Sequence, residues 1–124
     1  MEVSFTEREL DVMSVLWQLG SATVTEVRER LEDQLAYTTV LTVLRTLEAK
    51  GHVRHDEDGK AYRYYPLVAR ELAGRSALRR VTRKMFAGSP ALLLTQLVAD
   101  HDLDEAELAE LRALLDQRLG EEEK

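Results

Sequence analysis

The chain has 124 residues and no cysteine, which leaves room for one compact domain with an appendage and excludes disulfides and thiolate metal sites. Hydrophobic residues make up 44% and charged residues 32%, with no secretory leader or membrane-spanning apolar run, so we expect a soluble cytoplasmic protein without membrane insertion. The net charge of −6 excludes nucleic-acid binding only if the charge is spread evenly, because phosphate binding needs just one basic face.

Two helix starts are evident near the N-terminus. Thr6 with Glu9 and Thr23 with Glu26 each form a capping-box pattern, in which a hydroxyl and a carboxylate three residues apart satisfy free backbone amides. The first helix is expected to end at Gly20. Helical spacing then predicts one buried apolar side on each helix: Leu10, Met13, Leu16 and Trp17 on the first, and Val24, Val27 and Leu31 on the second.

The third predicted helix runs from Tyr37 to Lys50, with Gly51 behind it, and its two sides differ in chemistry. At about 100° per residue, one side is aliphatic and carries Val40, Val43, Leu44 and Leu47. The other side is small, rich in hydroxyl groups and almost free of acid: Thr38, Thr39, Thr42, Arg45, Thr46 and Ala49. Threonine is a poor helix former, and an ordinary solvated side would carry long Glu and Lys chains. The pattern therefore favours close contact with a partner.

Beyond Gly51 the pattern alternates with a period of two and predicts a β-hairpin. Residues 52–57 and 60–66 have the pattern of strands, Asp58-Gly59 suits a two-residue type I′ turn, and Pro66 ends the second strand. Three helices followed by a hairpin is the order of a winged helix-turn-helix. The third helix would then enter the DNA major groove, and the hairpin would be the wing.

From residue 67 onward the sequence predicts helices alone. Gly74 is expected to interrupt the first of them and Gly88 to end it, while Ser89-Pro90 and Asp104 with Glu107 start two more. These helices hold more leucine than so short a segment can bury alone, so we expect a second copy of the chain to cover it. The residues expected to dimerise are Leu92, Leu93, Leu97, Leu108, Leu111 and Leu115.

The predicted fold is mainly α with a small β-hairpin: a winged helix-turn-helix DNA-binding domain over 1–66, followed by a helical dimerisation region over 67–124. Charge is uneven along it, with a net charge of −4 over 1–68, +5 over 69–88 and −7 over 89–124. The basic stretch is suited either to the flank of a DNA duplex or to the acidic tail of a partner chain, and the charge balance favours the tail. Its basic residues are Arg70, Arg75, Arg79, Arg80, Arg83 and Lys84.

Three stretches carry a family resemblance. Residues 10–17, Leu-Asp-Val-Met-Ser-Val-Leu-Trp, and residues 36–47, Ala-Tyr-Thr-Thr-Val-Leu-Thr-Val-Leu-Arg-Thr-Leu, resemble the first helix and the recognition helix of the penicillinase repressor family. This family is the BlaI and MecI group of bacterial regulators. Residues 62–66, Tyr-Arg-Tyr-Tyr-Pro, are similar to the end of its wing, and the leucine-rich tail is similar to its dimerisation region.

The resemblance implies a dimeric, sequence-specific repressor of β-lactam-resistance or related stress genes, bound to an inverted-repeat operator. It also implies release by a membrane sensor metalloprotease, whose cleavage position corresponds to Gln96 and Leu97 here. The copper-responsive branch of the family uses C-terminal cysteines, so this chain is not expected to share that metal response. We expect no cofactor and no enzymatic activity, because the chain has no Ser-His-Asp spacing, phosphate loop or catalytic carboxylate pair.

The candidate DNA contacts lie on the third helix and the wing. Arg45 is best suited to read a base, because a guanidinium can bind guanine through two hydrogen bonds. Tyr37 is placed for a phosphate near the helix start, and the acids around Arg54 make it a weaker wing candidate. The full set of predicted DNA-binding residues is Tyr37, Thr38, Thr39, Thr42, Arg45, Thr46, Lys60 and Arg63.

Other interpretations stay open at this point. The hydroxyl-rich side of the third helix could be an ordinary solvated surface, and the acidic total allows a winged-helix module that binds protein and never DNA. A ligand sensor is less favoured, because no convergent polar set indicates a pocket. A histidine metal site is disfavoured too: His52 and His55 should point to opposite faces of a strand, and His101 has only carboxylates beside it.

Overall fold

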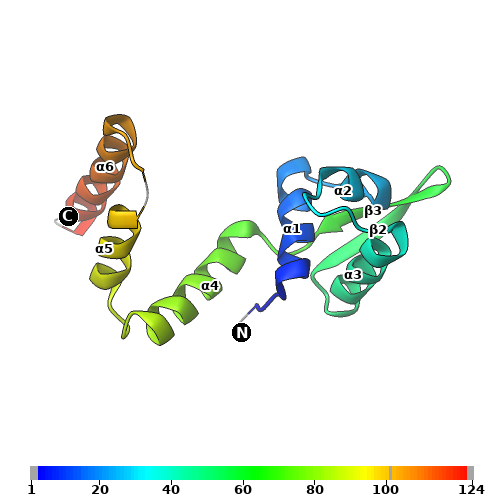
Figure 1. Ribbon diagram of the computed structural model, residues 1–124, viewed down its shortest axis with the longest axis horizontal. Coiled ribbons are helices and arrows are strands. Elements are labelled where there is room, and N and C mark those ends of the chain that lie inside the picture. The colour runs from blue at the N-terminus through cyan, green and yellow to red at the C-terminus, as the bar shows by residue number, and fades with distance from the viewer. Residues whose placement is uncertain (1–2, 101, 123–124) are drawn as a thin grey trace. The chain divides into compact units, whose positions relative to one another are not determined.

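A computed structural model describes residues 3–100 and 102–122, and the chain divides into two compact units, residues 1–80 and 81–124. Helices dominate and the strands form one small sheet, which confirms the predicted class, mainly α with a small β-hairpin. In chain order the elements are α1 (Glu7–Leu19), β1 (Ala22–Thr23), α2 (Val24–Arg30), α3 (Tyr37–Ala49), β2 (Val53–Asp58), β3 (Ala61–Pro66), α4 (Arg70–Met85), α5 (Pro90–Asp100) and α6 (Glu105–Glu122) (Figure 1).

Both predicted capping boxes are present. At the start of α1 the Thr6 hydroxyl accepts from the Glu9 amide at 3.1 Å, and the Glu9 carboxylate accepts from the Thr6 amide at 2.8 Å. Thr23 and Glu26 make the same exchange at the start of α2. α1 ends before Gly20, whose φ of 84° is a conformation that glycine adopts without strain. The predicted starts of these helices and the stop at Gly20 are therefore confirmed.

An aliphatic core joins the three N-terminal helices to the sheet. The predicted inner side of α3 is confirmed, with Val40, Leu44 and Leu47 fully buried and Val43 partly buried. The prediction for α1 was wrong at Leu10, which is 47% exposed, because at 100° per residue the buried side of that helix is centred about 130° away. The side chains that α1 buries are Glu9, Val12, Met13, Val15 and Leu16.

The sheet contains one strand that no sequence pattern predicted, β1. Its order is β1-β3-β2 and it is antiparallel throughout, with Ala22 and Thr23 of β1 paired to Tyr64 and Arg63 of β3. A strand of two residues directly before a capping box has no periodicity that a sequence pattern can detect. As a result β3 is the central strand, and Arg63 lies beside the start of α2.

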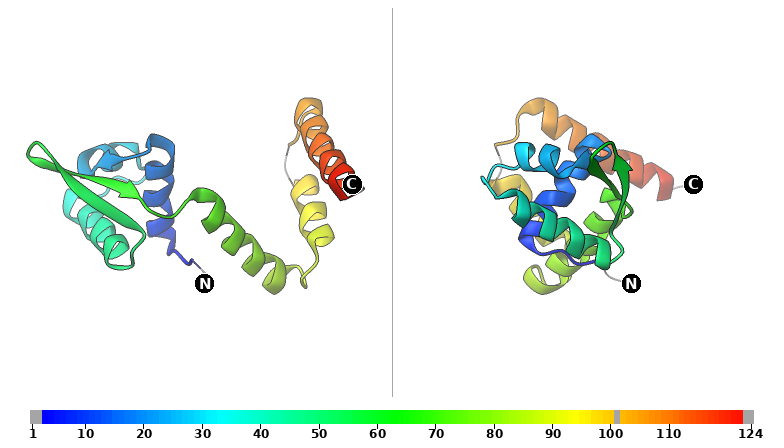
Figure 2. Two further views of the ribbon diagram at one scale, coloured as in Figure 1. Left: turned by 180° about the vertical axis from the view of Figure 1, so that it is seen from behind. Right: turned by 90° about the vertical axis from the view of Figure 1, so that its right-hand side faces the viewer.

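The hairpin turns one residue later than predicted. Asp58 pairs with Ala61 in the strand ladder, so the central residues of the turn are Gly59 and Lys60, not Asp58 and Gly59. Gly59 has a φ of 64°, whereas Lys60 does not have a positive φ. A type II′ turn needs a positive φ only at its first central residue, and type I′ needs it at both, so the turn is of the II′ kind. Its tip extends beyond the three helices in both side views (Figures 1 and 2).

α4 is one continuous helix, contrary to the predicted interruption at Gly74. Glycine costs a helix only about 1 kcal/mol, and packing on both sides of it offsets that cost. Ala73 and Ser76 are buried, and the Ser76 hydroxyl donates to the Val3 carbonyl at 3.1 Å. These contacts attach the first half of α4 to the N-terminal unit, which is why the compact units divide after residue 80. The functional boundary at 66/67 stays a prediction.

The C-terminal unit has two helices with well-defined starts. The Leu92 amide donates to the Ser89 hydroxyl at 3.2 Å, and the Glu107 amide donates to the Asp104 carboxylate at 2.8 Å, so both predicted N-caps are confirmed. α4 ends at Met85, slightly before the predicted Gly88. Over residues 3–100 and 102–122, no helix is long and apolar enough to cross a membrane.

Candidate nucleic-acid interface

The hydroxyl-rich side of α3 faces outward. Tyr37 is 45% exposed, and every residue predicted on that side is exposed while the aliphatic side is packed inward. Figure 2 shows α3 running along the surface of the N-terminal unit beside the hairpin. The exposed residues are Thr38, Thr39, Thr42, Arg45, Thr46 and Ala49.

Two threonine hydroxyls on this side are oriented by the helix itself. Thr42 donates to the Thr38 carbonyl and Thr46 donates to the Thr42 carbonyl, both at 2.9 Å. Because each hydroxyl hydrogen is already used, the side chains present an oxygen acceptor and a methyl group to the outside. Those are the groups that can meet an exocyclic amine or a thymine methyl in the major groove.

Arg45 is the one cation on the outer side of α3, and no carboxylate within the described ranges pairs with it. The nearby acid, Glu48, is bonded to His55 instead, with its carboxylate oxygens 2.6 and 2.8 Å from Nδ1. Beneath them the phenol of Tyr64 is buried; burial and the Glu48 charge raise its pKa, and the Arg45 charge opposes this. Turning Glu48 toward the wing leaves the guanidinium of Arg45 available to an outside partner.

The start of α3 lacks the internal cap that α1 and α2 have. Its N-cap residue is Ala36, which offers no side-chain acceptor, and the first turn contains no acid. The loop before it is held by Arg28, whose Nε donates to the Leu35 carbonyl at 2.8 Å. Free amides and the positive end of the helix dipole suit a phosphate group, next to the exposed Tyr37.

The two predicted basic residues of the wing have different surroundings. Lys60 lies exposed in the turn and has no ion pair in the described chain. Arg63 is held within the unit, with nitrogens 2.9 Å from both Glu26 Oε1 and Asp58 Oδ2. These carboxylates raise the pKa of Arg63, led by its hydrogen bond to Asp58. The structure therefore holds Arg63 within the unit, where it links β3 to the start of α2 and to Asp58, the last residue of β2.

The histidines of the hairpin do not converge. His52 packs its ring against Phe5 with centroids 5.0 Å apart, and His55 contacts Tyr62 and Tyr64 in addition to Glu48. No group of three metal-binding side chains is found over the described ranges. His101 lies outside the described residues.

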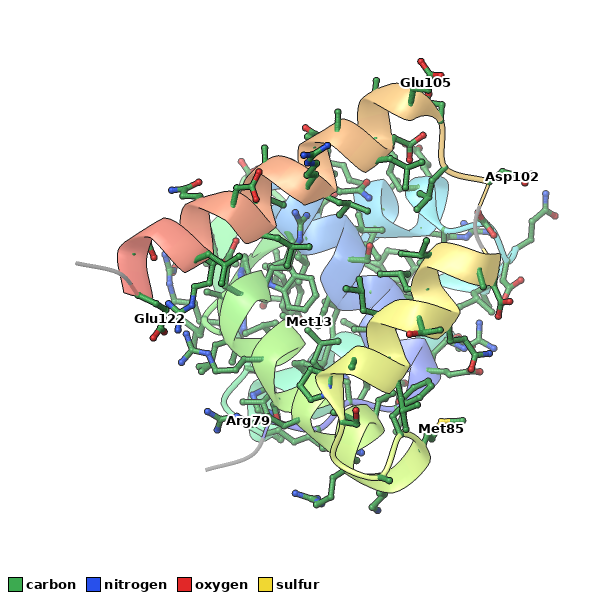
Figure 3. The ribbon with its side chains drawn as sticks, turned by 90° about the vertical axis from the view of Figure 1, so that its left-hand side faces the viewer. Met13, Arg79, Met85, Asp102, Glu105 and Glu122 are labelled. Carbon is green, nitrogen blue, oxygen red and sulfur yellow. The ribbon has the colours of Figure 1, made fainter. Side chains whose placement is uncertain are left out.

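The predicted dimerisation leucines are exposed or half-buried in the single chain. Leu92 is 53% exposed and Leu115 equally so, and no side chain of α5 or α6 in the described ranges is buried. Figure 3 displays these helices with their side chains, from Glu105 at the start of α6 to Glu122 at its end. The remaining predicted positions are exposed at Leu97 and Leu108 and half-buried at Leu93 and Leu111.

Comparison with known proteins agrees with this geometry. The family model described as penicillinase repressor matches residues 5–117. The chain belongs to the penicillinase repressor family. This confirms the resemblance found in the sequence motifs, and places the protein among winged-helix, DNA-binding repressors of transcription.

The matches between this penicillinase repressor family member and its individual relatives span most of both chains. It is 37% identical over 114 residues to the transcriptional regulator BlaI of Mycobacterium tuberculosis, covering 85% of this chain and 83% of the relative. It is 26% identical over 112 residues to the methicillin resistance regulatory protein MecI of Staphylococcus aureus, covering 89% and 91%. These relatives are regulators rather than enzymes.

A solved structure supports the fold. A MarR family protein from Bacillus stearothermophilus superposes with a TM-score of 0.53 at 20% identity, over 98% of this chain and 78% of that one. At that identity the likeness supports the winged-helix architecture and nothing finer.

Proposed function

We propose that this protein is a homodimeric repressor that binds an inverted-repeat operator in the cytoplasm, with one α3 in each of two successive major grooves. The observation that carries the proposal is the exposed side of α3, where Arg45 has no ion pair in the described chain and Glu48 is turned away to His55. A two-fold dimer would separate the two helices by about 34–36 Å, one turn of DNA.

The roles within each half-site follow from the side chains. Arg45 would bind guanine through two hydrogen bonds, and Thr38, Thr39, Thr42 and Thr46 would line the groove with methyl groups and acceptors. Tyr37 and the free amides at the start of α3 would hold one phosphate, and Lys60 at the wing tip would hold another. Because two carboxylates already bind Arg63, we propose that it braces the wing, and contacts phosphate only if it leaves them.

The exposed leucines of α5 and α6 support the dimer, since water contact with so many apolar side chains is unfavourable. By the family resemblance, the controlled genes would be those of β-lactam resistance or a related stress. A membrane sensor metalloprotease would end repression by cutting at Gln96 and Leu97, both exposed on α5. That cut would separate the end of α5 and all of α6 from the rest of the chain, and with them four of the six predicted dimerisation leucines.

The experiment replaces Arg45 with alanine and measures operator affinity by fluorescence anisotropy. Loss of a bidentate base contact should weaken binding by about 1 to 3 kcal/mol per half-site and relax the preference at one base pair. Arg8→Ala is the matched control, because it removes the same charge from α1, where Arg8 pairs with Asp33. A folded Arg45→Ala dimer that binds as tightly as the parent would refute the assigned role.

The competing function is a winged-helix module that binds protein and never DNA. The salt dependence of binding distinguishes it from the proposed repressor. Each phosphate contact releases a counterion, so operator affinity should fall steeply between 50 and 200 mM salt, by about a thousandfold for six contacts. A mainly apolar protein contact would change little over that range.

A further inference from the structure

Two arginines on α4 are exposed and have no carboxylate partner in the described chain. Arg8, Arg54 and Arg63 are in ion pairs, whereas Arg75 and Arg79 have none in residues 3–100 and 102–122. They are four residues apart, so they lie one above the other on the helix (Arg79 is labelled in Figure 3). Leu78, which is 56% exposed, lies beside them.

α6 carries the opposite arrangement. Its leucines at 108, 111, 115 and 119 follow helical spacing and form one stripe. At about 100° per residue, Glu107 and Glu110 lie together with Leu114, which is 61% exposed, on the side of α6 beyond Leu111. Both glutamates are exposed and have no ion pair in the described chain, and Arg118 of the same helix bonds to Glu121 and Glu122 instead. Like the arginines, they are about one helical turn apart.

We propose that the Arg75–Arg79 edge of α4 docks on the Glu107–Glu110 edge of α6 of a second copy. The proposal rests on the homodimer proposed above and names the contact that orients it. Two cations beside exposed Leu78 would face two anions beside exposed Leu114, so apolar burial and charge pairing occur together. Two-fold symmetry would repeat the contact, giving four arginine–glutamate pairs.

Charge complementarity favours α6 of a second copy over the flank of a DNA duplex as the partner of Arg75 and Arg79. Residues 69–88 carry a net charge of +5 and residues 89–124 a net charge of −7, so bringing them together cancels most of both. If the arginines were used for DNA, a dimer would hold two strongly acidic tails, which the duplex would repel.

The test uses two charge-reversed, full-length chains: R75E/R79E and E107R/E110R. Each alone places like charges opposite one another, so its dimer dissociation constant should rise at least about tenfold. Mixed in equal amounts they should form a heterodimer with parental affinity, within about threefold, because one contact is native and the other is reversed but still complementary. Differently tagged chains, equilibrium sedimentation and circular dichroism report pairing, affinity and folding.

Each remaining outcome overturns the inference in a recognisable way. Folded variants that are weakened alone and not restored by mixing would place the pairing within one chain. An R75E/R79E chain that still dimerises but loses operator affinity would assign the arginines to DNA. A parental chain that is monomeric would refute the homodimer of the proposed function itself, together with this contact.

Discussion

At the scale of single residues, the ion pair between Glu9 and Lys50 ties the first helix to the end of α3. Lys50 Nζ lies 2.7 Å from Glu9 Oε2, and Glu9 is only 4% exposed. Burial raises the pKa of Glu9, but Lys50 and the bonds from Thr6 outweigh it, so the pKa lies below its ordinary value of 4.5. This carboxylate therefore serves two purposes, capping α1 and anchoring the helix that we propose reads DNA.

The Glu9–Lys50 pair predicts how the free energy of unfolding depends on pH. A carboxyl with a lowered folded-state pKa stabilises the fold fully above its ordinary value of 4.5 and loses that contribution as the pH falls through the folded-state pKa. Glu9→Gln keeps the capping acceptor and removes the charge, so at neutral pH the free energy of unfolding should fall by about 1 to 3 kcal/mol. Urea unfolding followed by the fluorescence of Trp17 measures it.

The difference between parent and Glu9→Gln should shrink as the pH drops well below 4.5, because the parental carboxyl is then protonated as well. Glu7→Gln, an exposed acid in the same first turn, is the control and should cost only a few tenths of a kcal/mol. Equal losses for both variants at every pH would contradict the assigned role of the Lys50 pair.

At the scale of elements, the wing has a braced base and a tip that depends on one glycine. Arg54 stacks over the Tyr65 ring near the base, with its guanidinium carbon 4.2 Å from the centroid, and Arg63 joins β3 to Glu26 and to Asp58. At the tip, Gly59 has a positive φ and open space beside it. Side-chain clashes therefore do not exclude other residues there; backbone conformation does.

Gly59→Ala should accordingly loosen the wing. A positive φ costs an L-residue about 1 to 2 kcal/mol, so amide hydrogen exchange in β2 and β3 should speed up by about 5- to 30-fold. Lys60→Ala, at the neighbouring turn position without a positive φ, is the control: exchange should hardly change, while the salt slope of operator binding should drop by about one ion per wing. Unchanged exchange in Gly59→Ala would refute the type II′ geometry.

At the scale of the whole molecule, the two units bury their apolar residues differently. The N-terminal unit has a continuous core from Val12 to Tyr64, whereas α5 and α6 have no buried side chain in the described chain. Met85, labelled in Figure 3, is 74% exposed at the end of α4. We infer that the first unit folds around its own core and that the second completes its core by association.

Leu115→Asp tests that inference. An aspartate in the middle of the leucine stripe would bury an unpaired charge in the proposed interface, so the chain should become monomeric at micromolar concentration. Gln117→Asp places the same residue on the opposite side of α6 and should leave the dimer intact. Light scattering after size-exclusion chromatography reports the mass. A Leu115→Asp chain that still dimerises would move the interface elsewhere.

Local sequence by itself determined the helix caps, the inward and outward sides of α3, and the presence of a hairpin. Capping boxes and periodicity involve neighbours three or four residues apart, so the pattern and the interaction lie in the same short segment. Thr6 with Glu9 and Thr23 with Glu26 are examples, and so is the outward side that carries Arg45.

Only the tertiary structure decided which of these side chains already have a partner within the chain, and how the elements pack. It added β1 to the sheet, moved the turn to Gly59 and Lys60, kept α4 continuous through Gly74, and bound Arg63 to Glu26 and Asp58. Many of these contacts join residues far apart in the chain, such as Glu9 and Lys50, separated by 41 positions. A periodic pattern carries no information about such partners, because only the packing of whole elements brings them together.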